Sequence, residues 1–132
     1  MCIFCKIINK EIPCYPVYED EEIIAFLDIA QATIGHTLVV PKKHYDTFID
    51  CPPVIFDQMM RVTKDLTKLV LNKTNASGFN ILNNGYEIAG QVIMHAHMHI
   101  IPRYNENEGF NPSFVDNSKN VNLEEIHQLL TK

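Results

Sequence analysis

Three of the chain's six histidines stand at alternate positions within the stretch MHAHMHIIPRY, residues 94–104. They are His95, His97 and His99, and the residues that follow them are Ala96, Met98 and Ile100. Alternation with period two is typical of a β-strand, whose successive side chains point to opposite faces of a sheet. We predict a strand over residues 93–100 that buries the apolar spacers and places the imidazoles on one face, about 6.6–6.8 Å apart.

The chain is long enough for one domain with a single core, since it has 132 residues of which 46% are hydrophobic. Its apolar runs, such as IIAFL and TLVVP, are far shorter than the roughly 20 residues that cross a bilayer. The N-terminus MCIFCKIINKEIP lacks the basic and apolar regions of a signal peptide. We expect a cytoplasmic protein without a membrane partner.

The net charge is −5, from 11 Lys and Arg against 16 Asp and Glu. Proteins that bind the phosphates of DNA or RNA need a basic surface, so a polymeric nucleic acid partner is disfavoured. A small anionic ligand is compatible with this charge, because a few local donors can hold one phosphate.

Cysteine use points to a reducing compartment, because four cysteines occur in a chain without an export signal. There, the spacing of Cys2 and Cys5 in CIFC suggests a metal or redox motif before it suggests a disulfide. No thioredoxin-like pattern surrounds the pair, and a four-coordinate zinc would need two further ligands. Metal-free thiols are the third interpretation, and Cys14 and Cys51 are expected to be unpaired.

Residues 52–73, PPVIFDQMMRVTKDLTKLVLNK, carry the clearest helix pattern in the chain. Two prolines open the segment, which suits the first turn of a helix. Apolar side chains then recur at spacings of four, three, four and three, which predicts one buried stripe. The stripe consists of Ile55, Met59, Val62, Leu66 and Leu69.

Shorter segments around this helix predict further strands and two short terminal helices. Strands are expected at 17–18, 23–27, 36–41 and 78–84, and helices within 2–11 and 122–130. Asn122 is expected to cap the last helix, and a polar excursion over residues 103–120 precedes it. The order of strands, long helix, strands and short helix predicts an α+β domain, an antiparallel sheet with helices on one side.

The histidine pattern permits two kinds of chemistry. In one, imidazoles two residues apart share a single catalytic zinc. On a regular strand, however, His95 and His99 begin about 13 Å apart, so three ligands on one ion would require a distorted strand. In the other, the histidines act separately along a bound ligand, where one neutral imidazole attacks phosphorus and a neighbour holds phosphate oxygens.

The stretch GQVIMHAHMHIIPR resembles the signature of the histidine triad (HIT) family, in which apolar residues follow His-x-His-x-His. Upstream, IIAFLDIAQATIGHTLVVPKKH resembles the family's strand–loop–strand segment, and CIFCKIINKEIP with VYEDEEIIAF resembles the N-terminus of its Hint-like branch. The resemblance covers residues 2–104 of a single domain, 1–132, and leaves 105–132 unassigned. It implies a five-stranded antiparallel sheet with one long helix, continued across a two-fold homodimer by pairing of the long helix and a sheet edge.

The resemblance further implies a hydrolase or nucleotidyl transferase that acts on purine nucleoside phosphoramidates or related adenylates. His97 would be the nucleophile that attacks the α-phosphorus and forms a covalent nucleotidyl intermediate, which water then hydrolyses. His99 would contact the α-phosphate, and His36 would orient the triad from beneath. A dinucleoside polyphosphate hydrolase and a non-catalytic nucleotide-binding regulatory module are the alternatives.

The implied nucleotide site draws on side chains from several segments. The resemblance assigns Asp28 to the ribose hydroxyls, Phe4, Ile7 and Ile29 to the base, and Asn84 to the phosphates. Gly90 and Gln91 match the short turn before the triad strand, where the missing side chain of Gly90 would let backbone donors approach an anion. Taken alone, Asp28 and Asn84 are also typical of turns, and the three apolar residues are also typical of a core. Val92 departs from relatives that carry a hydroxyl residue at this position, so it offers no proton to a leaving group.

For the cysteine pair, the resemblance implies a structural zinc completed by the histidine of PKKH and the first histidine of the triad. The ligands would be Cys2, Cys5, His44 and His95. Such a Zn²⁺ site would tie the N-terminus to the strand that carries His97. The three histidines would then serve the metal, the reaction and the phosphate respectively.

Overall fold

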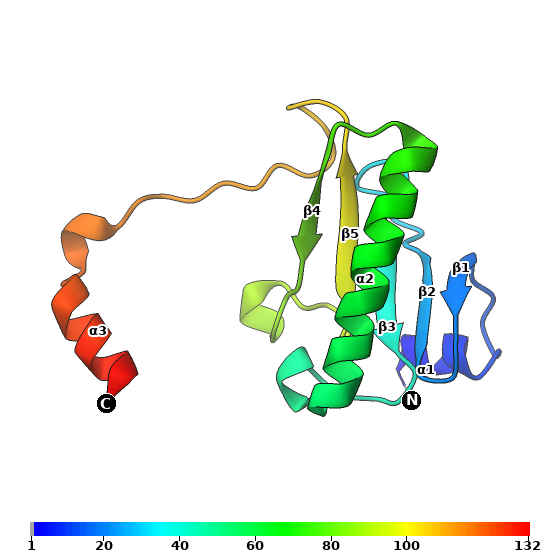
Figure 1. Ribbon diagram of the computed structural model, residues 1–132, viewed down its shortest axis with the longest axis horizontal. Coiled ribbons are helices and arrows are strands. Elements are labelled where there is room, and N and C mark those ends of the chain that lie inside the picture. The colour runs from blue at the N-terminus through cyan, green and yellow to red at the C-terminus, as the bar shows by residue number, and fades with distance from the viewer. Residues whose placement is uncertain (1) are drawn as a thin grey trace.

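The computed structural model describes residues 2–132, which form a five-stranded antiparallel sheet with helices packed on it (Figure 1). The strand order is β1-β2-β3-β5-β4, so β1 and β4 are the two edges. The predicted α+β fold is confirmed. The strands are β1 (Pro16–Glu19), β2 (Ile23–Leu27), β3 (Thr37–Pro41), β4 (Gly78–Leu82) and β5 (Met98–Arg103). The helices are α1 (Ile3–Ile8), α2 (Pro53–Thr74) and α3 (Leu123–Thr131), with 3-10 turns η1 (Phe48–Asp50), η2 (Glu87–Ala89) and η3 (Ser118–Asn120).

Helices cover both faces of the sheet, because β2 is apolar along its whole length. Ile23 and Ala25 belong to the core beneath α2. Their sequence neighbours, Ile24 and Phe26, lie in a second core that includes Phe4 of α1. The expectation of helices on one side alone is therefore wrong, because an unbroken apolar run such as IIAFL indicates a strand that is buried on both faces.

The long helix α2 has Pro53 at its first position, as the sequence predicts. Four of the five residues in the predicted stripe are buried, but Leu69 is 45% exposed. Spacings of four and three average 3.5 residues, whereas a straight helix turns every 3.6, so the stripe drifts off the sheet. Thr63 and Thr67 are buried instead, and their hydroxyls donate to the carbonyls of Met59 and Thr63.

The histidine strand begins later than predicted, because β5 starts only after His97. The amide of His95 donates to the Ile93 carbonyl, and the amide of Ala96 donates to the carbonyl of Tyr45. These two bonds keep the first two histidines of the triad out of the sheet, so the prediction of three imidazoles on one regular strand is wrong. The predicted burial of the spacers is confirmed, since the core beneath α2 contains Ala96, Met98 and Ile100.

The chain after β5 divides into a tethered turn and a free arm. Glu108 bonds to Arg103 at 2.7 Å, and the hydroxyl of Tyr104 donates to the Ile34 carbonyl, so residues 103–110 stay on the domain. Residues 111–132 then run away from the sheet and end in α3 (Figure 1). The side chain of Asn122 caps this helix as predicted, by accepting from the Glu125 amide. Within residues 2–132, none of the helices has the length and apolar character to cross a membrane.

A comparison within α2 tests the packing directly. Met59 is fully buried between helix and sheet, so Met59→Ala should lower the free energy of unfolding by about 2–5 kcal/mol. Leu69→Ala removes a half-exposed side chain of the same helix and should cost no more than about 1 kcal/mol. Urea unfolding of both variants measures the difference, and equal losses would contradict the drift of the stripe.

Candidate active site and metal centre

A backbone carbonyl holds the ring of His97. Nδ1 of His97 lies 2.7 Å from the carbonyl oxygen of His95, and a carbonyl only accepts, so Nδ1 carries the proton. Nε2 of the neutral ring is then left with its lone pair. Burial lowers the pKa of His97, which favours this neutral form. The ring packs edge-on against Phe4, with 5.1 Å between the ring centroids.

The neighbouring pair, His36 and His99, is oriented in the opposite sense. The amide of Ala32 donates to Nδ1 of His36 at 3.2 Å, so the proton of this ring lies on Nε2. That N–H donates to Nδ1 of His99 at 2.9 Å, which leaves His99 with its own proton on Nε2. Burial, together with His97 and His36, lowers the pKa of His99 to about 4. A neutral N–H donor therefore stands beside the lone pair of His97, with the two ring centroids 4.9 Å apart.

His97 and His99 line a cleft of about 380 Å³, a volume in the range of small-molecule sites. Asp28 adds the only carboxylate of this lining, and the other walls are mostly apolar. They are formed by Ile3, Phe4, Ile7, Ile12, Pro13, Cys14, Phe26, Leu27, Ile29, Ala30, Leu38, Asn84, Gly90, Val92 and Ile93. One polar end and a long apolar wall suit a ligand that joins an anionic group to a flat hydrophobic ring.

The structure separates the candidate base-contacting residues from one another. Ile29 is 90% exposed at the mouth of the cleft, so it is not a core residue. Phe4 and Ile7 are buried in the core beneath α1 and also form part of the cleft wall. Asp28 caps its turn through Oδ1, which accepts from the Ala30 amide at 2.9 Å, while Oδ2 lies 3.6 Å from Nε2 of His36.

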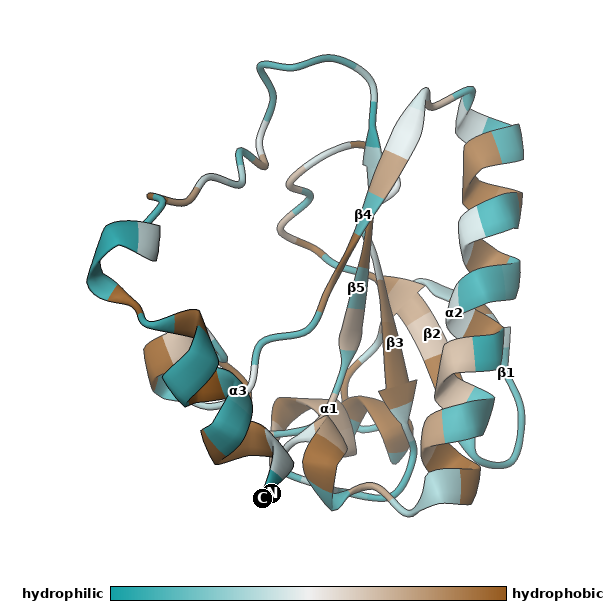
Figure 2. Cartoon of the chain, turned by 60° about the vertical axis from the view of Figure 1, so that its left-hand side comes forward, coloured by the Kyte–Doolittle hydropathy of each residue, from teal (hydrophilic) through white to brown (hydrophobic). Residues whose placement is uncertain are grey.

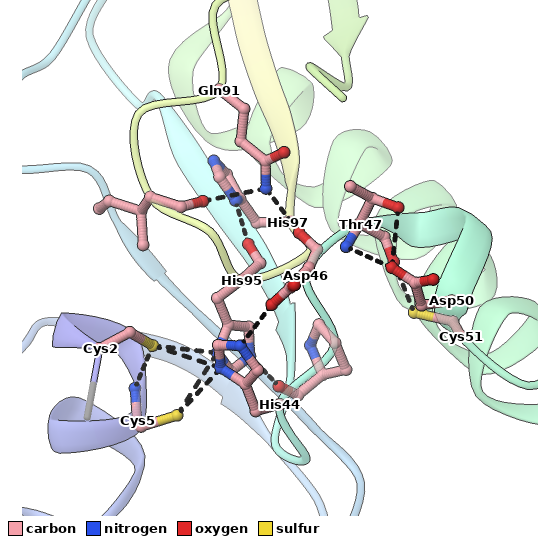
Figure 3. A network of polar contacts seen from close by, with 12 residues as sticks. Cys2, Cys5, His44, Asp46, Thr47, Asp50, Cys51, Gln91, His95 and His97 are labelled. Carbon is pink, nitrogen blue, oxygen red and sulfur yellow. Dashed lines mark hydrogen bonds and ion pairs between the residues drawn. The ribbon is translucent and has the colours of Figure 1, made fainter. Parts of the chain in front are cut away.

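The loop before the triad contributes Asn84 and Gly90 to the cleft, but not the side chain of Gln91. Asn84 donates to the Gly90 carbonyl at 3.4 Å, and Gly90 has φ 97°, a conformation that favours glycine. Gln91 is buried, and its amide nitrogen donates to the carbonyls of Asp46 and Ile93 at 2.6 and 3.0 Å (Figure 3). Its side chain thus supports the turn before the triad from behind.

Asn83 makes a positioning contact that the sequence does not predict. Nδ2 of Asn83 donates to the carbonyl oxygen of His97 at 3.0 Å, so it anchors the main chain just before β5. The only local signal is the pair of asparagines in NNG, which predicts a turn and does not distinguish the two. Val92 is 91% exposed at the cleft, where it presents methyl groups alone.

The second cluster of titratable side chains joins α1 to the segments after β3 and before β5 (Figure 3). Nδ1 of His95 lies 3.3 Å from Sγ of Cys2 and 3.6 Å from Sγ of Cys5. Nδ1 of His44 lies 3.6 and 3.4 Å from the same sulfurs, and the two Nδ1 atoms are 3.1 Å apart. A tetrahedral zinc with bonds of about 2.0–2.3 Å has ligand–ligand edges of roughly 3.3–3.8 Å. This group could hold a metal ion.

Hydrogen bonds on the far side of each ring point its lone pair at this cluster. Nε2 of His95 donates to the Pro41 carbonyl at 2.8 Å, and Nε2 of His44 donates to Asp46 at 2.9 Å, so both Nδ1 atoms lack a proton in the neutral rings. Burial lowers the pKa of His95, which keeps the ring neutral. Burial acts to raise the pKa of the Cys2 thiol, but hydrogen bonds from Cys5 and His44 outweigh it and lower the pKa. Two facing lone pairs 3.1 Å apart repel unless a cation lies between them.

The three histidines of the triad do not converge on one ion. Among residues 2–132, His95 groups with His44 and the cysteines, His99 groups with His36 and Asp28, and His97 belongs to neither group. The single catalytic metal is therefore wrong as an interpretation of the triad. All four cysteines are free thiols, as expected for Cys14 and Cys51.

Comparison with known proteins identifies the family. The family model described as HIT domain matches residues 9–106. An uncharacterized HIT-like protein of Methanocaldococcus jannaschii is 51% identical over 128 residues, which are 96% of this chain and 95% of that protein. The chain belongs to the HIT family.

Solved structures and other curated proteins extend the comparison. Crystal structures of HIT family proteins from Bacillus anthracis and Bacillus subtilis match with TM-scores of 0.93 and 0.92 at 42% and 39% identity, and each covers 98% of this chain and 92% of its own. Adenosine 5'-monophosphoramidase HNT1 of Saccharomyces cerevisiae is 39% identical over 108 residues, 82% of this chain and 66% of that protein. Adenylylsulfatase HINT3 of Arabidopsis thaliana is 41% identical over 102 residues, 77% and 52% of the two chains.

The neutral state of His99 predicts how stability depends on pH. Because the folded pKa lies near 4 and the unfolded pKa near 6.5, the unfolded chain binds the proton more tightly, so stability is lost as pH falls from 6.5 toward 4. His99→Asn should reduce the loss of unfolding free energy between pH 7.5 and 5 by an amount on the order of 1–2 kcal/mol, a value lowered because solvent partly reaches the ring. Urea unfolding at pH 7.5 and 5 measures it. His127→Asn, on exposed α3, is the control and should keep the wild-type slope; an unchanged slope in His99→Asn would contradict the prediction.

Proposed function

We propose that this protein is a nucleotide hydrolase or nucleotidyl transferase that cleaves the bond to the α-phosphate through a covalent intermediate on His97. Purine nucleoside phosphoramidates and related adenylates are the proposed substrates. The observation that carries the proposal is the free lone pair on Nε2 of His97, fixed by the 2.7 Å bond to the His95 carbonyl at a mostly apolar cleft. Relatives named as an adenosine 5'-monophosphoramidase and an adenylylsulfatase support this substrate class.

The first step forms a bond from Nε2 of His97 to the α-phosphorus and breaks the bond to the leaving group. For a phosphoramidate, the P–N electron pair leaves with the amine, which takes a proton. Because Nδ1 keeps its proton against the His95 carbonyl, the nucleotidylated imidazole is cationic and is itself a good leaving group. Water then attacks the phosphorus, releases the nucleoside monophosphate and a proton, and restores the free ring.

His99 is proposed to stabilise the charge on the α-phosphate. Its Nε2–H follows from the bond that His36 donates to Nδ1, so it donates to a phosphate oxygen without a change of protonation. Asn84 and the backbone at Gly90 line the same cleft and supply further donors. Since Val92 has no acidic proton to donate, the leaving group is expected to take its proton from solvent. This favours amines that water protonates readily, and it favours leaving groups that are stable enough to depart without a proton.

The nucleoside is proposed to lie along the apolar wall. A carboxylate has about four lone-pair sites, and Asp28 uses one on the Ala30 amide, so it can accept from both ribose hydroxyls. The base would pack between Ile29 at the mouth and Phe4 and Ile7 at the wall. Ordering of the exposed Ile29 by a bound base would bury apolar surface that the free protein leaves in water.

Replacement of the nucleophile tests the proposal. His97→Ala should lower turnover of adenosine 5'-monophosphoramidate by at least about 10⁴-fold, because it removes the imidazole that forms the bond to phosphorus. AMP binding, measured by calorimetry, should persist within about tenfold, since the apolar wall, Asp28 and His99 are unchanged. His127→Ala is the control and should keep wild-type turnover.

The outcomes separate the alternative functions. Wild-type turnover in His97→Ala would overturn the covalent mechanism. Tight AMP binding without any turnover in the wild type would favour the regulatory binding module. Faster cleavage of a diadenosine polyphosphate than of the phosphoramidate would favour the dinucleoside polyphosphate hydrolase.

We further propose that Cys2, Cys5, His44 and His95 hold a structural Zn²⁺. The converging lone pairs and the sulfur–nitrogen distances of 3.3–3.6 Å support this ligand set. With four protein ligands the ion would keep no open position, so it would stabilise the fold without entering the reaction. Thiolate ligands persist in a reducing compartment, which is consistent with the cytoplasm.

Metal analysis tests the zinc site. Protein purified without chelator should contain about one zinc per chain, and Cys5→Ala should reduce it to near zero and lower the Tm by at least about 5 °C. Cys14→Ala, which removes a thiol outside the ligand set, should change neither quantity. A zinc content near zero in the wild type would refute the site. Loss of turnover after chelation, with the fold intact by circular dichroism, would instead favour a catalytic metal.

We also propose that the protein works as a two-fold homodimer. The edge strand β4 is unpaired on one side, and a groove of about 400 Å³ runs between it and α2. The groove exposes Phe79 and Ile81 of β4 beside Met60 and Leu71 of α2. A second copy that pairs at this edge would extend the sheet and cover the apolar groove.

A further inference from the structure

The C-terminal arm, residues 111–132, ends in an amphipathic helix and is tied to the preceding turn by the bond that Asn111 donates to the Glu108 carbonyl. Every residue of the arm is exposed. Its helix α3 carries apolar side chains at spacings of three, three and one, which form one face (Figure 2). They are Leu123, Ile126, Leu129 and Leu130, and three of these four are more than 70% exposed. Four exposed apolar side chains on one face of a capped helix indicate a surface that is covered by a partner.

The superposition of this chain on two solved relatives extends into the arm. The arm makes up residues 111–132 of 132, so a superposition that covers 98% of the chain must include most of it. Two bacterial HIT proteins superpose at this coverage with TM-scores of 0.93 and 0.92, although only 42% and 39% of their residues are identical. An arm whose residues are all exposed holds a constant position only if something outside its own domain fixes it. In a crystal of one protein, the macromolecule at hand is another copy of the same chain.

The path of the arm locates that copy. Figure 1 shows the arm leaving the end of β5, passing beyond the edge strand β4 and turning down to α3, which stands apart from the sheet. The arm therefore borders the space beside β4, and the apolar groove between α2 and β4 lies at this same edge. The turn of residues 103–110 is held to the domain by the 2.7 Å bond between Arg103 and Glu108, which aims the arm outward.

We propose that the arm is an exchanged segment: α3 of each chain docks through its apolar face on a second copy, which occupies the α2–β4 edge. The exchange is reciprocal, so each chain of the dimer packs its α3 against the other chain. This inference rests on the homodimer proposed above and adds to it the element that holds the copies together. The 22-residue α2 and the sheet edge would align the two chains, and the arms would supply most of the apolar surface buried away from the edge.

Full-length variants of α3 test the proposal. Leu129→Glu with Leu130→Glu places two carboxylates on the apolar face, and the control, His127→Glu with Gln128→Glu, places two on the polar face. Light scattering at micromolar concentration should give about twice 15.2 kDa for the wild type and the control. The Leu129/Leu130 variant should have a dimer dissociation constant at least about a hundredfold higher, because each dimer loses four buried leucines. Circular dichroism checks that each variant remains folded.

Hydrogen exchange of the α3 amides provides the second readout. In the wild type, protection of α3 should fall on dilution together with the mass of the particle. A wild-type dissociation constant in the Leu129/Leu130 variant would overturn the exchanged arm while leaving the dimer intact. A monomeric wild type at micromolar concentration would overturn both the dimer and the arm. Protection of α3 that does not depend on concentration would place the arm on its own domain and refute the exchange.

Discussion

The hydrogen bond from Nδ1 of His97 to the carbonyl of His95 is the contact on which the proposed chemistry of the cleft depends. An imidazole in water exchanges between two tautomers, and only the one with Nδ1 protonated presents a lone pair on Nε2. The carbonyl selects that tautomer without a charge. Its own position is set by the ring of His95, which donates to the Pro41 carbonyl at the end of β3 and faces the cysteine pair. A fully buried residue therefore orients the proposed nucleophile two positions later.

Neutrality is what allows so many imidazoles to lie together. His97 and His99 have ring centroids 4.9 Å apart, and His36 and His99 are 5.1 Å apart. If these rings were charged, they would repel one another in a site where burial weakens solvent screening. Burial lowers the pKa of all three rings. The hydrogen bond from the Ala32 amide to Nδ1 of His36 places the proton of that ring on Nε2, and the bond from this N–H to His99 places the proton of His99 on its own Nε2. The result is a lone pair on one ring beside an N–H on the next, which suits attack on a phosphorus whose oxygens need a donor.

Local patterns in the sequence predicted what local physics decides. The apolar periodicity of residues 52–73 predicted α2, because burial against a sheet imposes a 3.6-residue period, and the alternation after His95 predicted the buried spacers. The start of β5 was mispredicted because it depends on the bond between the amide of Ala96 and the carbonyl of Tyr45, which are 51 positions apart. The hydrogen bonds of Gln91 depend on the same long-range packing, since its amide donates to the Asp46 carbonyl. Family motifs located the two histidine clusters, but no pattern in the sequence showed which carbonyl each ring would meet.

These long-range bonds explain how one short segment contributes to both the candidate metal centre and the candidate active site. The segment 44–46 carries the ligand candidate His44, the Tyr45 carbonyl that receives the Ala96 amide, and the Asp46 carbonyl that receives Gln91. It therefore holds both the residue before His97 and the loop that ends at Gly90. A regular strand would separate the imidazoles by about 6.6–6.8 Å on one face and leave them to solvent. Residues 93–97 instead lie against segment 44–46. In this position His95 faces the cysteines, while His97 and His99 lie close to each other at the cleft.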